Sequence, residues 1–195
     1  RPRALLFQRS AGTPAPFESR DRWCVQSGEQ IMSLIGKQIR PRDIVTRKSL
    51  ENAARVVAAT GGSTNAALHL PAIAHEAGID FDLHEVARIF RSMPYIADLM
   101  PGGKYTAVDL YGVGGIPVVM KEMLDSGLLH GECLTVTGKT IAESLKKVKF
   151  PENQKVVYRV KNPISKTGGV VGLKGNLATE GAIVKIAGLK KLQFT

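Results

Sequence analysis

A glycine-rich segment, Gly61-Gly62-Ser63-Thr64-Asn65, combines residue types that could bind an anion. Glycines let the backbone approach a ligand closely, and free amides at the start of a helix favour a negative group such as a carboxylate. His69 follows about one helical turn later and could reach the same face. The alternative is that Ser63 or Thr64 only caps the helix and that His69 is structural. We take as candidate substrate-proximal residues Gly62, Ser63, Thr64, Asn65 and His69.

Two other glycine-containing segments fail as nucleotide-binding motifs. The Thr137-Gly138-Lys139-Thr140 segment lacks the earlier glycine of a phosphate-binding loop, because Cys133 stands at that position. The segment 112–117 has Pro117 where a dinucleotide-binding turn needs its third glycine, and no strand is predicted before it. HExxH and GxSxG strings are absent. The remaining histidines have no partner at metal-ligand spacing: His75, His84 and His130. Residue types alone therefore identify no catalytic and no metal-binding residue.

Cys24 and Cys133 are the two cysteines, and neither belongs to a CxxC pair. This pattern predicts neither a disulfide framework nor a zinc site, and it favours a reducing, cytoplasmic setting. Both cysteines are predicted to be packed thiols. A membrane span is not expected, because the longest uncharged apolar run covers only residues 116–120.

The formal net charge of +10 raises nucleic-acid binding as an alternative function. Basic and acidic residues number 10 and 4 in residues 1–50, 5 and 10 in residues 51–138, and 12 and 3 in residues 139–195. We interpret these blocks as basic surfaces facing an anionic substrate or other parts of a larger protein, or simply as solvated lysines. Aromatic residues make up only 6% of the chain, which argues against stacking on single strands. We expect no nucleic-acid partner.

The elements that must position these residues are helical in the first two thirds of the chain. Apolar spacing predicts an amphipathic helix over residues 19–36. Thr46 and Asp82 are predicted helix N-caps, Gly78 is a predicted helix end, and Pro71 should kink the helix that contains it. Helices are predicted over residues 19–36, from 46 through 57, over 66–77, from 82 to Pro94 and over 118–126.

The character of the chain changes beyond residue 130. Short β-branched runs separated by Gly, Pro and Asn predict strands at residues 134–136, 155–160, 170–173 and 182–186. The segments around Asn162-Pro163-Ile164 and Thr167-Gly168-Gly169 are predicted turns. We therefore predict an α/β chain with a domain boundary near residue 130.

Several strings, read in order, resemble the dihydroxy-acid dehydratase family. Together they cover nearly everything from Ser10 onward, and the related sugar-acid dehydratases share the general pattern. The strings are Arg40-Pro41-Arg42-Asp43-Ile44-Val45-Thr46, Thr60-Gly61-Gly62-Ser63-Thr64-Asn65-Ala66, Gly114-Gly115-Ile116-Pro117, Leu134-Thr135-Val136-Thr137-Gly138-Lys139-Thr140, Asn162-Pro163-Ile164, Thr167-Gly168-Gly169, Lys174-Gly175-Asn176-Leu177-Ala178 and Glu180-Gly181-Ala182-Ile183-Val184-Lys185.

The resemblance implies a hydro-lyase that converts 2,3-dihydroxy-3-methyl carboxylic acids to 2-oxo acids in branched-chain amino-acid biosynthesis. It also implies an iron–sulfur cluster and magnesium in the intact enzyme, with the cluster cysteines, magnesium-binding acids and catalytic serine in motifs that this sequence lacks. We therefore expect no catalytic and no metal-binding residue in this chain. A sugar-acid dehydratase of the same family, or a noncatalytic basic interaction or nucleic-acid-binding module, are the alternative functions.

The resemblance further implies a division of the chain. Residues 1–130 would form the mostly helical end of an N-terminal α/β domain, and residues 131–195 the start of a C-terminal β-barrel-like domain, with the substrate site between them. Arg1 is not a methionine, so we expect a truncated chain. The resemblance implies an internal fragment of a homo-oligomeric enzyme, and because the catalytic and metal-binding motifs are missing we expect the fragment to be inactive alone.

Overall fold

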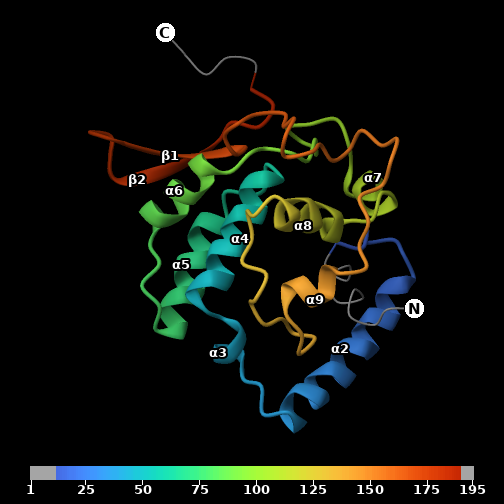
Figure 1. The fold of residues 1–195 in the computed structure, drawn as a ribbon. Helices are drawn as coiled ribbons and strands as arrows, with labels where there is room; N and C mark the ends of the chain where they lie inside the picture. The colour runs from blue at the N-terminus through green and yellow to red at the C-terminus, as the bar shows by residue number, and fades with distance from the viewer. Residues whose placement is uncertain (1–11, 190–195) are drawn as a thin grey trace.

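The computed structural model describes residues 12–189, which form eight helices and one two-stranded sheet. Figure 1 shows α4, α5 and α6 side by side, with the two strands lying over α6 and with α2 at the opposite end of the molecule. The elements are α2 Ser19–Gly36, α3 Pro41–Ile44, α4 Arg47–Ala59, α5 Ala66–Ala77, α6 Leu83–Ser92, α7 Ala107–Gly112, α8 Ile116–Asp125, α9 Ile141–Leu145, β1 Val170–Gly175 and β2 Ala178–Lys185. The fold is thus mostly helical, with a small sheet near its C-terminal end.

The helices on either side of the glycine-rich segment begin and end as predicted. Thr46 caps α4 by accepting a hydrogen bond from the Ser49 amide at 3.2 Å, and the Ser49 hydroxyl accepts in turn from the Thr46 amide at 2.8 Å. α5 ends at Gly78, whose φ of 73° is the left-handed conformation that glycine adopts without strain. Pro71 lies inside α5, and a kink there stays a prediction. Asp82 caps α6 by accepting from the Glu85 amide at 2.8 Å.

α4, α5 and α6 pack around the main core. Ala54 and Ala58 of α4 are completely buried, as are Val86 and Phe90 of α6. The small alanine side chains let the backbones of α4 and its neighbours approach closely. Burial of a large apolar side chain such as Phe90 stabilises the fold by about 1.5–3 kcal/mol. β1 packs against α6, so the C-terminal segment is attached to this core.

The predicted strands are only half right. Residues 170–175 and 178–185 form the antiparallel hairpin β1–β2, with Val170 opposite Lys185. Residues 134–136 and 155–160 were wrongly predicted as strands, because each contributes a single isolated bridge, Leu134 to Thr140 and Val157 to Ala97. The β-branched side chains of 155–160 instead serve burial: Val157 is only 2% exposed. A β-branched run marks a buried extended segment, but it becomes a strand only where a neighbouring segment continues the ladder.

Three short helices, α3, α7 and α9, were not predicted. α7 and α9 each begin with a threonine whose hydroxyl caps the third following amide, Thr106 to Asp109 at 3.3 Å and Thr140 to Glu143 at 3.2 Å. The carboxylates of Asp109 and Glu143 accept from the threonine amides in return, which lowers the pKa of both acids. The spacing of a threonine three residues before an acid is a capping-box signature, so the sequence did contain a signal for α7 and α9.

α2 has the predicted bounds, but no residue of α2 is buried. Its apolar side chains are largely exposed: Val25, Ile31, Met32 and Ile35. α8 lies close to its predicted range, with Pro117 in the first turn and Gly127 beyond the end at φ 72°. No helix in residues 12–189 has the combined length and apolar character that a membrane crossing requires.

Candidate functional site

The glycine-rich segment forms the reversal between α4 and α5. Gly61 has a φ of 59°, and its amide donates to the carbonyl of Ala58 at 3.2 Å. The amide of Gly62 donates to the carbonyl of Val57 at 2.9 Å. These bonds close the end of α4, so the two glycines have a defined structural role in turning the chain.

The three residues that follow are exposed and only partly engaged. The Ser63 hydroxyl accepts from the Asn65 amide at 3.2 Å, whereas Asn65, the N-cap of α5, makes no side-chain capping bond. Within residues 12–189 the amides of Ser63 and Thr64 and the Thr64 hydroxyl have no hydrogen-bond partner. Neither Ser63 nor Thr64 is the N-cap of α5, so the alternative that one of them caps the helix was wrong; the Ser63 hydroxyl only stabilises the turn before the helix. The amides of Ser63 and Thr64 are left available to a ligand.

His69 lies one turn into α5 and is exposed. Its amide donates to the Asn65 carbonyl at 2.9 Å, which places the two residues on one face of the helix. Unpaired amides and the positive end of a helix favour a carboxylate by roughly 0.3–1 kcal/mol. The segment thus offers hydrogen-bond donors for an anionic, hydroxylated molecule, and it offers no carboxylate that could act as a base.

A second motif contacts this reversal from a distant part of the chain. Gly169 approaches so closely that a Cβ on it would lie 2.6 Å from the Cα of Gly61 and 2.9 Å from the Cβ of Ala187. The amide of Gly169 donates to the Ala58 carbonyl at 3.2 Å, and the Ala187 amide donates to the Gly169 carbonyl at 3.0 Å. The segment 167–169 was predicted as a turn joining strands, but it packs against the end of α4. Three segments therefore meet at one backbone contact, which we call the glycine junction (Gly61, Gly169 and Ala187).

Tyr95 lies against the glycine junction and was not predicted as a site residue. A Cβ on Gly61 would lie 2.7 Å from Cε2 of the Tyr95 ring, and the tyrosine is only 5% exposed. Burial and the nearby Asp98 raise the pKa of the phenol. Tyr95 therefore stays protonated at neutral pH and cannot serve there as a base. The only sequence signal was its aromatic type, which is equally typical of a core residue.

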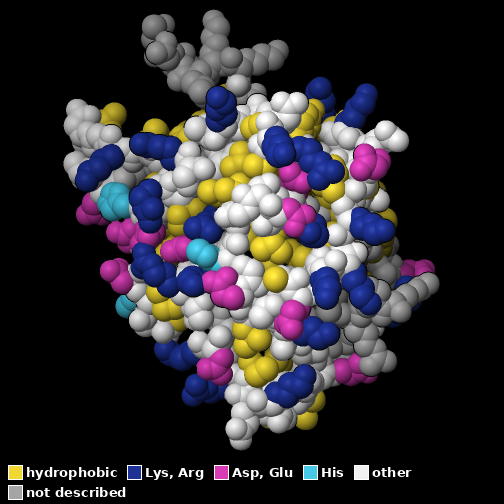
Figure 2. Space-filling view, viewed as in Figure 1, with side chains coloured by type: hydrophobic (Ala, Val, Ile, Leu, Met, Phe, Trp, Pro, Cys, Tyr) yellow, Lys and Arg dark blue, Asp and Glu magenta, His cyan; other side chains and the backbone are white. Residues whose placement is uncertain are grey.

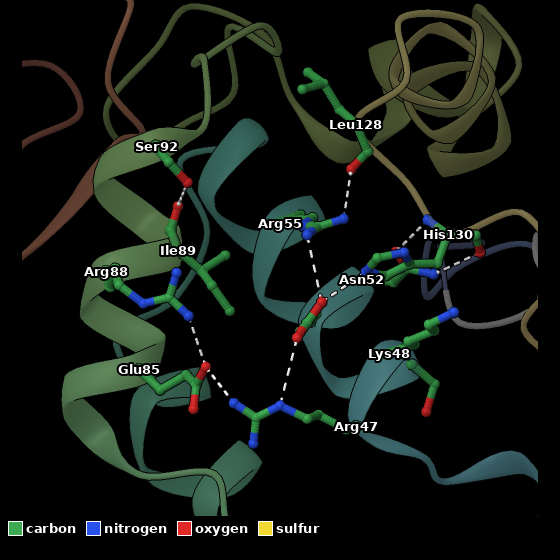
Figure 3. A network of polar contacts seen from close by, with 12 residues as sticks. Arg47, Lys48, Asn52, Arg55, Glu85, Arg88, Ile89, Ser92, Leu128 and His130 are labelled. Atoms are coloured by element: carbon green, nitrogen blue, oxygen red, sulfur yellow. Dashed lines mark hydrogen bonds and ion pairs between the residues drawn. The ribbon is translucent and has the colours of Figure 1, made fainter.

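The network in Figure 3 attaches the loop around His130 to α4. Glu51 accepts from Nε2 of His130 at 2.6 Å and pairs with Arg55 at 3.4 Å and with Arg47 at 3.6 Å. Buried Asn52 holds the His130 backbone at both ends: its carboxamide oxygen accepts from the amide at 2.8 Å, and its nitrogen donates to the carbonyl at 3.0 Å. His130 thus has a carboxylate partner that spacing alone did not reveal, and the arrangement is a structural clamp.

The described residues do not offer the ligands of an iron–sulfur cluster or of a magnesium site. Residues 12–189 contain no group of three His, Cys, Asp or Glu side chains arranged to hold a metal. Cys24 is exposed on α2, so the prediction that it is packed was wrong, whereas Cys133 is buried as predicted.

The two thiols are expected to differ in reactivity. Burial raises the pKa of the Cys133 thiol, which lowers the fraction of reactive thiolate. Under native conditions iodoacetamide should modify Cys24 at least about tenfold faster than Cys133, and urea should abolish the difference. Mass spectrometry of tryptic peptides after timed quenching measures both rates. Equal rates in the native protein would contradict the buried position of Cys133.

Comparison with known proteins gives a consistent result along the chain. The family model described as Dihydroxy-acid/6-phosphogluconate dehydratase N-terminal matches residues 4–144, and the corresponding C-terminal model matches residues 155–195. Dihydroxy-acid dehydratase 2 of Bradyrhizobium diazoefficiens is 67% identical over 191 residues, which are 98% of this chain and 33% of the relative. Dihydroxy-acid dehydratase of Parvibaculum lavamentivorans is 65% identical over 187 residues, 96% of this chain and 32% of the relative. The chain thus spans about a third of the length of these relatives.

Proposed function

The chain belongs to the dihydroxy-acid/6-phosphogluconate dehydratase family, and on this premise we propose that it is part of a hydro-lyase acting on 2,3-dihydroxy-3-methyl carboxylic acids. The product would be a 2-oxo acid of branched-chain amino-acid biosynthesis. The observation that carries the proposal is the identity of 62–67% to relatives named dihydroxy-acid dehydratase over nearly the whole chain.

We propose that the exposed reversal before α5 lies close to the substrate. The supporting observation is the pair of free amides at Ser63 and Thr64, beside the carboxamide of Asn65 and one turn from His69. Gly62 would contribute by letting the turn pack closely on α4, since a Cβ there would lie 3.0 Å from Cγ1 of Val57. These groups would bind and orient the substrate carboxylate or hydroxyl groups, because the free amides and the carboxamide nitrogen are hydrogen-bond donors.

The remaining parts of the proposal concern the intact enzyme. We propose that its iron–sulfur cluster and magnesium are bound by residues other than those described here, since the described donor set does not fit them. A homo-oligomeric state is proposed on the family relationship alone, and a cytoplasmic location on the absence of a CxxC pair. The domain boundary near residue 130 and the absence of a nucleic-acid partner stay predictions, and the N-terminal family model extends to residue 144.

A substrate comparison with the intact enzyme tests the proposed activity. We expect 2-oxo acid formation from 2,3-dihydroxy-3-methylbutanoate to exceed that from gluconate by at least about a hundredfold in kcat/KM, which corresponds to about 2.7 kcal/mol of transition-state binding. The reverse preference would assign the protein to the sugar-acid dehydratases, which the description of the same family model also covers.

Thr64→Ala in the intact enzyme tests the proposed site. A hydrogen bond to a charged group contributes about 1.5–3 kcal/mol, so we expect kcat/KM to fall roughly 10- to 100-fold without loss of stability. Thr179→Ala is the matched control, because Thr179 is an exposed threonine on the distant hairpin. Steady-state kinetics and thermal unfolding separate the two effects. Unchanged kcat and KM for Thr64→Ala would remove this segment from the site.

A further inference from the structure

A hollow of about 240 Å³ lies between α6 and the β1–β2 hairpin. It is separate from the glycine-rich reversal, and nothing in the proposed dehydratase function assigns it a role. The residues that line it include His84, Arg88 and Arg91 of α6 and Gly172, Lys174 and Gly181 of the hairpin.

The charged groups around this hollow are all basic. Arg88 and Arg91 of α6 and Lys174 of β1 contribute three positive charges, His84 adds an imidazole, and no acidic side chain lines the space. Residues 84, 88 and 91 recur at helical spacing, so they lie on one face of α6. Figure 2 shows basic and histidine side chains gathered over α6 and the hairpin, with acidic ones beside them.

Only one of the three cations is neutralised from nearby. Arg88 pairs with Glu85 at 2.7 Å, and Glu85 also binds Arg47 at 2.5 Å. Burial alone would raise the pKa of Glu85, but hydrogen bonds from the two arginines outweigh it and lower that pKa, so Glu85 stays ionised. Arg91 and Lys174 have no ion-pair or hydrogen-bond partner among residues 12–189.

Small residues hold the hairpin close to α6 and keep the hollow open. A Cβ on Gly172 would lie 2.2 Å from the Cβ of Ala87, so the strand backbone approaches the helix as closely as it can. Gly181 has a φ of 103°, and a Cβ there would meet Cε1 of His84 at 3.4 Å. A side chain at either position would push the two elements apart or fill the space. The glycines therefore bring Lys174 toward the cationic face of α6.

Like charges brought together around a concave space repel one another, and a bound anion removes this repulsion. Arginine presents a planar fork of donors that matches phosphate oxygens, and lysine adds a compact charge. A space of this size suits a small molecule that carries one or two phosphate groups. We propose that the hollow between α6 and the β1–β2 hairpin binds a small phosphate-bearing anion.

Calorimetric titration of the purified protein with pyrophosphate, at constant ionic strength, tests the proposal. We expect saturable binding that weakens at least tenfold in the double variant Arg91→Gln/Lys174→Gln. The control is Arg22→Gln/Lys37→Gln, which removes the same two charges on and next to α2, at the opposite end of the molecule. The control should bind pyrophosphate like the parent protein, and circular dichroism should show that both variants are folded.

Three results would overturn the proposal. Absence of saturable binding would mean that the cations are only solvated. An equal loss in both double variants would mean that the net charge of the protein, not the hollow, attracts the anion. Citrate binding as tight as that of pyrophosphate would mean that the site accepts carboxylates and has no preference for phosphate. None of these results bears on the dehydratase activity, so the two proposals succeed or fail separately.

Discussion

Gly169→Ala is expected to lower the free energy of unfolding by about 3 kcal/mol, the upper end of the range for an overpacked core. The added methyl would lie 2.6 Å from the Cα of Gly61 and 2.9 Å from the Cβ of Ala187. The first neighbour is backbone, which cannot move aside as a flexible side chain does. The segments must therefore separate, and the bond from the Gly169 amide to the Ala58 carbonyl should lengthen or break. Urea denaturation followed by circular dichroism measures the loss.

Gly175→Ala is the matched control for this prediction. Gly175 is also a glycine of the C-terminal segment, but a Cβ there meets nothing within 4 Å. The substitution should change the free energy of unfolding by less than about 1 kcal/mol, since only backbone entropy is altered. If Gly169→Ala were as mild as this control, the close approach of Gly169 to Gly61 would be wrong. Gly169→Ala in the intact enzyme should also lower the dehydratase activity, because the reversal before α5 would shift.

Glu122→Ala is expected to cost about 3 kcal/mol, the lower end of the range for breaking a buried ion pair. Glu122 is 6% exposed on α8. One carboxylate oxygen accepts from Nη1 of Arg159 at 2.8 Å, and the other accepts from the amide of Val160 at 2.9 Å. The Arg159 guanidinium also lies 3.6 Å from the centre of the Phe150 ring. Alanine leaves the Val160 amide without its acceptor and Arg159 without its carboxylate. The lower value applies because Arg159 is half exposed and water can solvate it.

Two further variants test whether the ion pair with Arg159 causes the loss of stability in Glu122→Ala. Glu132→Ala removes a carboxylate whose ion pair with Lys48 is 59% exposed on both sides, so it should cost below about 1 kcal/mol. Arg159→Ala combined with Glu122→Ala should cost less than the sum of the single changes, because the two residues form one interaction. If the loss of unfolding free energy in the double variant equalled the sum of the losses in the two single variants, the contact between Glu122 and Arg159 would be wrong. We expect Glu122→Ala to loosen the attachment of residues 159–160 to α8 while α4 to α6 remain folded.

The segments predicted correctly owe their structure to short-range interactions. Thr46 caps α4 through a residue only three positions away, and Gly78 ends α5 through its own backbone conformation. Such interactions form wherever the local string occurs, so residue types and spacing suffice to predict them. The family could be inferred for the same reason, since its motifs are local strings in a fixed order, and the match over residues 4–144 confirms that inference.

The predictions that were wrong depended on partners elsewhere in the chain. Residues 155–160 have the composition of a strand, yet the backbone they lie against, around Ala97, pairs with them at one bridge only. Cys24 was predicted to be packed, but no residue of α2 is buried in the structure. Burial and strand pairing are properties of two surfaces, and the sequence of one segment does not specify the other.

The sequence by itself determined the approximate limits of the longer helices, the family and the candidate segment 61–65, because each is encoded in neighbouring residues. Only the tertiary structure decided that Gly169 and Tyr95 contact Gly61, that Glu122 binds Arg159, and that cations of α6 and β1 surround one hollow. These contacts join residues far apart in the chain, and they form only when the chain folds and the core brings the segments together. The physical reason is that the effect of a glycine or a charged side chain depends on the residues that pack against it, and a local sequence pattern does not specify those residues.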